Sequence, residues 1–257
     1  MALIALNNKN EEVNILHFQG GNIFPLDKIF NIVKNNAELK PVSNNLSIIS
    51  CWTDDSKCHL LHQLTKNNIN LINALPKDYD FSQKWDMRNK IRYYINCLEN
   101  INTTYSLMLD GYDVLFVSTD NILNKFKNKG YKIIFNTTIN NYPDEKIDII
   151  YNNEKYEFKY FNAGCCIGYT SELLKFYKEC LEYINIENKL NSEQKILRHA
   201  FSKYSNDPKQ RFIYCDFRRN IFHSMGFTKC SYNINYNKLY IKLNKKGIED
   251  LKQINYI

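Results

Sequence analysis

Two aspartates separated by a glycine and a tyrosine form the most chemically informative segment of the sequence. Asp110 and Asp113 follow the apolar run Tyr105–Leu109, which is typical of a buried strand. Ligands of an open parallel sheet bind beyond the carboxyl ends of its strands, and a Gly-Tyr turn can direct both carboxylates to one point. Because two carboxylates repel each other unless a cation joins them, the spacing fits a Mg²⁺ or Mn²⁺ site shared with substrate phosphates. A surface turn built from Asp and Gly explains the same spacing, so both interpretations stay open.

A second unusual segment contains two of the few glycines in the chain. There are 8 glycines among 257 residues, and Gly164 and Gly168 both interrupt the apolar stretch 161–169. Small residues inside a strand mark places where the backbone has to come close to something else. We therefore treat 161–169 as a second candidate for functional contact.

The surrounding segments alternate between strand-like and helix-like patterns. This alternation predicts an α/β fold with a mostly parallel sheet. We expect residues 1–45 to be an N-terminal extension packed on a main domain of residues 46–257. The expected strands are 13–18, 46–52, 105–109, 131–135, 158–169, 212–215 and 239–243, and the expected helices are 25–33, 57–66, 85–98, 122–129, 171–183, 192–204 and 248–254.

Composition narrows the class of protein. Hydrophobic residues make up 44% of the chain, which supports a real core and excludes a wholly disordered protein. No apolar run approaches the ~18 residues of a membrane span, and the apolar opening is too short for a secretory signal. We therefore expect a cytoplasmic protein with eight reduced cysteines. The net charge of +7 is either a background of Asn- and Lys-rich composition, which we favour, or a surface for nucleic acid.

Several motifs, in the same order along the chain, resemble one family of enzymes. Met108–Phe116 is similar to the aspartate motif of the collagen glycosyltransferases, the glycosyltransferase domains of procollagen lysyl hydroxylases and their relatives. The resemblance covers about residues 46–257 and implies a GT-A fold, a Rossmann-like nucleotide-binding mixed sheet flanked by helices. It also implies Mn²⁺ and a UDP-glucose or UDP-galactose donor. The other similar stretches are 46–53, Arg88–Arg92, Asn162–Tyr169, Glu193–Gln194, Asp216 with Ile221–Phe222, and Asn244–Gly247.

The resemblance implies a role for each matched residue. Asp110 and Asp113 would hold Mn²⁺ or Mg²⁺, which bridges the two phosphates of the donor. Small residues would let the backbone approach the donor sugar closely. The remaining donor contacts implied are Tyr112 stacked on uracil, Trp52 as a wall of the same pocket, Lys90 at the diphosphate, Asn162, Ala163 and Gly164 against the sugar, and Gly247 near the nucleotide.

The sequence departs from the family pattern at two points. The third metal ligand of the family is a histidine near the end of the domain, and residues 239–247 contain none. Asn244 is the closest positional match, and its amide oxygen can bind a hard cation, with His223 as a distant alternative. The acidic stretch that the family uses near the reacting carbon is reduced to Glu193. Glu193 is either a base or ion-stabilising group, or a first-turn acid that complements the helix dipole.

These observations together predict a metal-dependent glycosyltransferase. It would transfer glucose or galactose from a UDP-sugar to an unidentified acceptor, which is a glycan, a protein or a small molecule. One alternative is a UDP-sugar-binding protein or hydrolase on the same fold without true transfer. A second alternative is a basic nucleic-acid-binding protein, although we expect no specific nucleic-acid partner.

Overall fold

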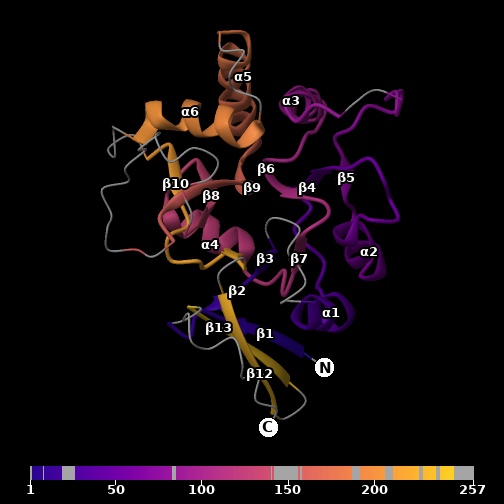
Figure 1. Ribbon diagram of the computed structural model, residues 1–257, viewed down its shortest axis with the longest axis vertical. Helices are drawn as coiled ribbons and strands as arrows, with labels where there is room; N and C mark the ends of the chain where they lie inside the picture. The colour runs from indigo at the N-terminus through magenta and orange to yellow at the C-terminus, as the bar shows by residue number, and fades with distance from the viewer. Residues whose placement is uncertain are drawn as a thin grey trace.

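A mixed six-stranded sheet forms the centre of the described part of the chain, in the order β10-β8-β9-β6-β4-β5 (Figure 1). The computed structural model describes residues 2–7, 9–18, 27–82, 85–139, 141, 156, 158–186, 192–205, 211–225, 228–235 and 238–245. For residues 2, 27–29, 185–186, 205, 228–235 and 238–245 it describes the backbone alone. β9 runs antiparallel to both of its neighbours, whereas β4, β5 and β6 are mutually parallel. The mostly parallel sheet expected from the alternation is therefore a mixed one. The strand bounds are β4 (Leu46–Cys51), β5 (Ile72–Asn73), β6 (Tyr105–Asp110), β8 (Ile133–Thr138), β9 (Tyr160–Tyr169) and β10 (Ile213–Cys215).

Helices cover both faces of this sheet. Successive residues of a strand point to opposite faces, and apolar residues on both faces have to be buried. Ile49 and Met108 point into a core with helices α3 (Asn89–Glu99), α5 (Thr170–Ile186) and α6 (Glu193–Ser205). Ile48 and Leu107 point into the opposite core, which the remaining helices cover. Helices α3, α5 and α6 lie together at the top of Figure 1. The helices on the other face are α1 (Asp27–Asn36), α2 (His59–Lys66) and α4 (Ile122–Lys129).

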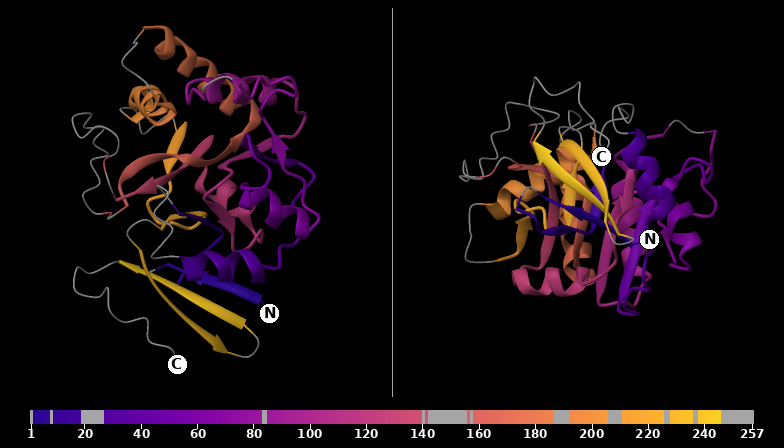
Figure 2. Two further views of the ribbon diagram at one scale, coloured as in Figure 1. Left: turned by 45° about the vertical axis from the view of Figure 1, so that its right-hand side comes forward. Right: turned by 90° about the horizontal axis from the view of Figure 1, so that it is seen from below.

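Two smaller sheets join the N-terminal segment to distant parts of the chain. The strand β3 (Ile15–His17) lies between β7 (Val114–Phe116), to which it is antiparallel, and β11 (Phe222–Ser224), to which it is parallel. The second sheet lies at the bottom of Figure 1 and has the order β12-β13-β1-β2 (Figure 2). Its strands are β1 (Ala2–Leu6), β2 (Glu12–Val13), β12 (Thr228–Asn235) and β13 (Lys238–Lys245). The first residues of the chain are thus built into sheets with residues far along the sequence.

Most expected elements are present, and the differences have local causes. Helix α3 begins at Asn89 rather than at residue 85 because the Asp86 carboxylate accepts a hydrogen bond from the backbone N–H of Arg88, a turn that competes with helix formation. The expected strand 239–243 lies within β13, whereas the expected helix 248–254 lies outside the described residues. Among the described helices, none combines the length and apolarity that a membrane crossing requires.

Candidate active site

A histidine and two aspartates converge at the end of β6. The Nε2 atom of His17 lies 3.6 Å from an Asp110 carboxylate oxygen and 3.4 Å from an Asp113 carboxylate oxygen. One potential ligand atom from each side chain falls within 4.8 Å of the others. The backbone supports this arrangement because the N–H of Phe18 donates to the carbonyl of Asp113 at 2.7 Å. A strand from the N-terminal segment is thereby held against the turn that contains both aspartates.

The donor set and the space around it fit a divalent metal ion. Two carboxylates and one imidazole nitrogen are ligand types that Mn²⁺ accepts. Gly164, on β9, leaves room for them: a Cβ atom there would lie 2.3 Å from His17 Cε1 and 2.6 Å from Asp110 Oδ2. A side chain at position 164 would therefore displace two of the three candidate ligands. The glycine that stood out in the sequence faces the candidate metal ligands.

The charges of the cluster would let a metal cation replace a proton on His17. Burial disfavours charge on His17, yet the neighbouring carboxylates of Asp113 and Asp110 outweigh burial and raise its pKa. Burial likewise opposes ionisation of Asp113, but the charge and hydrogen bond of His17 lower its pKa. The two carboxylates thus favour the protonated imidazole in the metal-free chain, and a bound metal ion would take the place of that proton.

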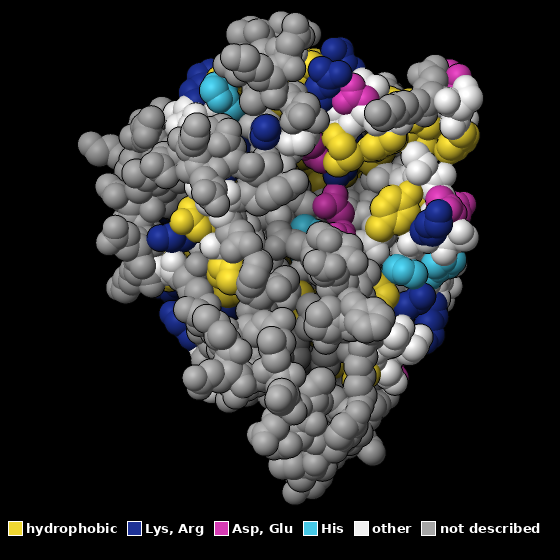
Figure 3. All heavy atoms as spheres, in the orientation of Figure 1, with side chains coloured by type: hydrophobic (Ala, Val, Ile, Leu, Met, Phe, Trp, Pro, Cys, Tyr) yellow, Lys and Arg dark blue, Asp and Glu magenta, His cyan; other side chains and the backbone are white. Residues whose placement is uncertain are grey.

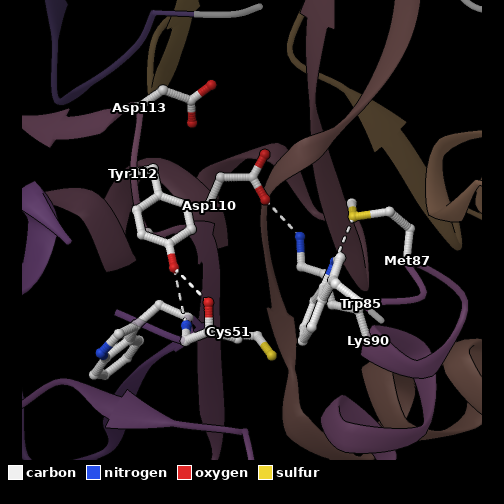
Figure 4. A pocket seen from close by; sticks show the side chains of 10 residues that line it. Cys51, Trp85, Met87, Lys90, Asp110, Tyr112 and Asp113 are labelled. Carbon is white, nitrogen blue, oxygen red and sulfur yellow. Dashed lines mark hydrogen bonds and ion pairs between the residues drawn. The ribbon is translucent and has the colours of Figure 1, made fainter. Parts of the chain in front are cut away.

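Lys90 links this cluster to a second, fully buried group. It lies in the first turn of α3, and its Nζ is 2.5 Å from an Asp110 oxygen (Figure 4). The same Nζ is 2.9 Å from a Glu193 oxygen. Burial disfavours its charge, but the two carboxylates raise its pKa well above the usual value. Lys90 therefore remains a cation, and it shares one carboxylate with the candidate metal site.

Glu193 is the first residue of α6, and its carboxylate pairs with Lys90. Burial raises its pKa to about 7, an effect that Lys90 only partly offsets and that the negative charge of Asp110 increases. Its Oε2 is paired with Lys90, whereas Oε1 has no hydrogen-bond partner among the described residues. Glu193 stands in the first turn, as one interpretation of the sequence held, but its ion pair gives it a role beyond the helix dipole.

A pocket with a cavity volume of about 360 Å³ opens beside these charges. In Figure 3, acidic side chains come to the surface in a hollow near the middle of the face, next to hydrophobic side chains. Lys90, Asp110 and Asp113 form the charged end of the pocket, as Figure 4 shows for the labelled side chains. The other lining residues are mainly apolar or aromatic: Cys51, Trp52, Thr53, Trp85, Met87, Gly111 and Tyr112.

Two aromatic residues expected at the nucleotide line this pocket. Tyr112 is 37% exposed, and its hydroxyl oxygen accepts hydrogen bonds from the backbone N–H groups of Thr53 at 2.9 Å and Asp54 at 3.2 Å. The indole N–H of Trp52 donates to an Asp55 carboxylate oxygen at 2.6 Å, and the side chain is almost fully buried. Tyr112 therefore offers a fixed ring to a ligand, whereas Trp52 serves the core and the pocket together.

The segment expected at the donor sugar lies on the His17 side of the site. The side-chain oxygen of Asn162 lies 3.1 Å from Nδ1 of His17, and the N–H of Ala163 donates to the side-chain oxygen of Gln194 at 2.7 Å. The Gln194 amide in turn donates to the carbonyl of Phe161 at 2.8 Å. Gln194 thus holds the start of α6 on the backbone of β9, and this contact places Glu193 beside Lys90.

The remaining predicted site residues are not brought to the cluster by the described structure. Asn244 lies on β13, where it pairs with Lys229 of β12, and its side chain is not among those described. Gly247 lies outside the described residues. His223 is buried with its ring 5.2 Å from that of Phe158 and does not belong to the carboxylate cluster.

Sequence reasoning missed His17, which the structure places at the carboxylates. The only local signal was a histidine inside the apolar stretch 15–18, and such a residue is more often part of a core. The search for a histidine ligand concentrated on the C-terminal residues because the family pattern placed it there. The positioning role of Gln194 was missed as well, although the Glu193–Gln194 pair matches the family pattern.

Comparison with known proteins supports the family that the motifs indicated. The family model for the PLOD GT domain matches residues 77–251, about two thirds of the chain. The match includes Lys90, Asp110, Asp113 and Glu193, and it begins after His17. No curated protein matches the chain. The mixed sheet flanked by helices is consistent with the GT-A architecture of such domains. The chain therefore belongs to the PLOD GT domain family, the collagen galactosyl- and glucosyltransferase domains of lysyl hydroxylases, and is a glycosyltransferase of that kind.

Proposed function

We propose that the protein is a Mn²⁺-dependent glycosyltransferase that takes glucose or galactose from a UDP-sugar. The observation that carries this proposal is the convergence of His17, Asp110 and Asp113 at the charged end of a pocket that aromatic side chains also line. A nucleoside diphosphate has the matching polarity, with a flat base at one end and two phosphates at the other. Asn244, the third ligand expected from the sequence, is replaced by His17 in this proposal.

Different residues of the chain would have different roles in such a reaction. A divalent ion held by His17, Asp110 and Asp113 would neutralise charge on the diphosphate as it leaves. Lys90 adds a fixed positive charge at the same end of the pocket, and Tyr112 presents its ring for the uracil. Loss of one such charge-stabilising contact typically costs ~3 kcal/mol, or about a hundredfold in rate.

Glu193 is the proposed proton acceptor for the acceptor hydroxyl. A general base works best when its pKa lies near the working pH, and burial raises the pKa of Glu193 to about 7. Its Oε1 has no hydrogen-bond partner among the described residues, so a lone pair is available there. The neighbouring Lys90 would stabilise the carboxylate form before the proton arrives.

Calorimetric titration of UDP, with and without Mn²⁺, tests the nucleotide site. Asp113→Asn removes one proposed ligand charge, and we expect it to abolish the metal-dependent part of the binding. Asp120→Asn is the matched control, because Asp120 is a partly exposed carboxylate that pairs with Lys40 away from the pocket. Equal UDP binding by wild type and Asp113→Asn would contradict the proposal. Salt-sensitive oligonucleotide binding that survives Asp113→Asn would instead support the nucleic-acid alternative.

A hydrolase on the same fold is the second candidate, and one observation favours it. The acidic stretch of the family is reduced to Glu193, and one oxygen of that carboxylate is already paired with Lys90. Incubation with UDP-sugar and Mn²⁺ separates the two functions, because a hydrolase releases UDP at the same rate without an acceptor. A thermal-shift screen across UDP-sugars identifies the donor, since ligand binding raises the apparent stability.

A further inference from the structure

The buried side of His17 contacts a chain of polar side chains that lies outside the pocket. The Nδ1 atom of His17 is 3.1 Å from the Oδ1 atom of Asn162. The amide nitrogen of Asn136 donates to the same oxygen at 3.1 Å and to the Ser224 hydroxyl at 3.0 Å. All four side chains are at least nine-tenths buried. Polar groups buried to this extent fix one another's orientation, because no solvent is present to replace a lost partner.

Backbone hydrogen bonds determine how both amides are oriented. A backbone N–H can only donate, and the N–H of Gly164 lies 3.1 Å from the side-chain oxygen of Asn162. The N–H of Thr137 likewise donates to the side-chain oxygen of Asn136 at 2.8 Å. The atom that Asn162 presents to His17 is therefore an oxygen, which accepts hydrogen bonds and cannot donate them.

This orientation determines which nitrogen of His17 carries the hydrogen. Both N–H bonds of the Asn136 amide have oxygen acceptors, in Asn162 and Ser224, so its 3.3 Å approach to His17 Nδ1 need not be a hydrogen bond. The Ser224 hydroxyl donates onward to the carbonyl of Thr137 at 2.7 Å, so its oxygen is the acceptor in the contact with Asn136. His17 Nδ1 must then be the donor to Asn162, and the neutral ring keeps its lone pair on Nε2.

We propose that Asn162 is a positioning residue for the metal site: it holds His17 in the Nδ1–H tautomer and so directs the Nε2 lone pair toward Asp110 and Asp113. The inference rests on the proposed metal site and gives Asn162 a different role from the donor-sugar contact expected from the sequence. A histidine that binds a metal through one nitrogen commonly donates its other N–H to an oxygen, and this contact raises metal affinity.

An irregularity in the sheet brings Asn162 to this position. Phe135 of β8 pairs with Cys166 of β9, but the next residue, Asn136, pairs with Asn162. Three residues of β9 are therefore left over between the two pairs, and they include Gly164, which lies against His17 and Asp110. Bulges of this kind redirect side chains beside active sites. One local distortion thus supplies both the space for the ligands and the acceptor that orients His17.

Titration of Mn²⁺ alone, followed by the electron paramagnetic resonance signal of the free ion, tests the inference without nucleotide or turnover. We expect Asn162→Leu to weaken Mn²⁺ binding by about 10- to 100-fold. Asn162→Asp keeps an oxygen toward His17 and should bind within a few-fold of wild type. Asn7→Leu is the matched control, because Asn7 is another fully buried, hydrogen-bonded asparagine, remote from the carboxylates. Unchanged Mn²⁺ affinity in Asn162→Leu, with weaker binding of UDP-sugar, would overturn the inference and favour the sugar contact.

Nitrogen-15 NMR of the wild-type histidines gives a second readout that needs no folded variant at Asn162. His17→Gln identifies the signals of His17 by their disappearance. In protein saturated with diamagnetic Mg²⁺, which would replace the proton between Nε2 and the carboxylates, we expect hydrogen on Nδ1, and hydrogen on Nε2 would overturn the inference. If the wild type binds neither Mn²⁺ nor Mg²⁺, the proposed metal site itself fails, whereas hydrogen on Nε2 in metal-bound protein would remove only the role of Asn162.

Discussion

The candidate site has an open half, with Asp110 and Asp113, and a buried half, with Lys90 and Glu193. The two halves differ in how much water reaches their charges. The side chains of Asp110 and Asp113 are 31% and 23% exposed, whereas those of Lys90 and Glu193 are 6% and 5% exposed. Partial exposure lets a charged ligand enter and leave the first half. In the second half, each charge depends on its protein partner, because desolvation is costly. Asp110 belongs to both halves, so a change in one is expected to reach the other through this carboxylate.

Removal of the buried cation should have the largest effect on stability. Lys90→Met leaves Glu193 without its cation, and we expect a loss of ~3 kcal/mol in the free energy of unfolding at pH 8. The loss should shrink at pH 5.5, where Glu193 takes up a proton instead. Urea denaturation of the metal-free chain at both pH values measures this difference.

Glu193→Gln is the matched partner of this experiment. Since the pKa of Glu193 is already raised to about 7, its neutral form is easily populated, and Lys90 keeps the carboxylate of Asp110. We therefore expect Glu193→Gln to cost no more than ~1 kcal/mol. Equal losses in the two variants would show that the buried half does not depend on its cation as described.

Gly164→Ala should damage the open half with little effect on the buried one. The added Cβ would collide with the His17 ring and an Asp110 oxygen, so we expect Mn²⁺ affinity to fall by about 10- to 100-fold. Gly168→Ala on the same strand is the control, because its Cβ would meet the carbonyl of Lys132 at 2.9 Å. This control should lower the melting temperature and leave Mn²⁺ affinity unchanged. Equal Mn²⁺ affinities in the two variants would contradict the placement of the metal.

The smallest expected effect is a pH dependence to which both halves contribute. The pKa values of His17 and Glu193 are raised in the folded chain, so their contribution to stability is complete below their unfolded values and is lost as pH rises through the folded ones. Metal-free protein should therefore become less stable, with a lower melting temperature, as the pH rises from 5 to 8.

Bound Mn²⁺ should reverse part of this loss of stability at high pH. Mn²⁺ needs a neutral imidazole, so its stabilising effect should be larger at pH 8 than at pH 6. Scanning calorimetry with EDTA and with Mn²⁺ measures both curves, and Glu193→Gln isolates the share of His17. A melting temperature independent of pH, together with equal shifts by Mn²⁺ at both values, would contradict the assignment of these two groups.

The sequence was most informative where the chemistry is local. Asp110 and Asp113 belong to one turn after one strand, so their spacing was enough to predict that they lie together. Lys90 and Glu193 stand in the first turns of two helices; the family motifs implied that Lys90 lies at the diphosphate and left Glu193 as either an active-site carboxylate or a helix-dipole acid. The α/β architecture was also predicted correctly, because alternating helix and strand patterns are a property of short segments.

The rest of the site depends on which strands become neighbours, and no short segment contains that information. His17 meets the aspartates because β3 pairs with β7 and β11, strands that begin far along the chain. The role of Asn162 depends on a shift in pairing between β8 and β9, which leaves no signature in either strand alone. The family pattern pointed to the C-terminal residues for the third ligand, whereas the histidine that lies beside the aspartates comes from the opposite end of the chain.

The position of β3 between two late strands has a consequence for how the protein is made. Translation proceeds from the N-terminus, so the segment with His17 leaves the ribosome long before β11 is synthesised. Until then it has at most one of its two sheet neighbours. The sheet that holds His17 beside the aspartates is therefore complete only after residues 222–224 have been made, and a metal ion bound by these side chains would stabilise that sheet only at this late stage.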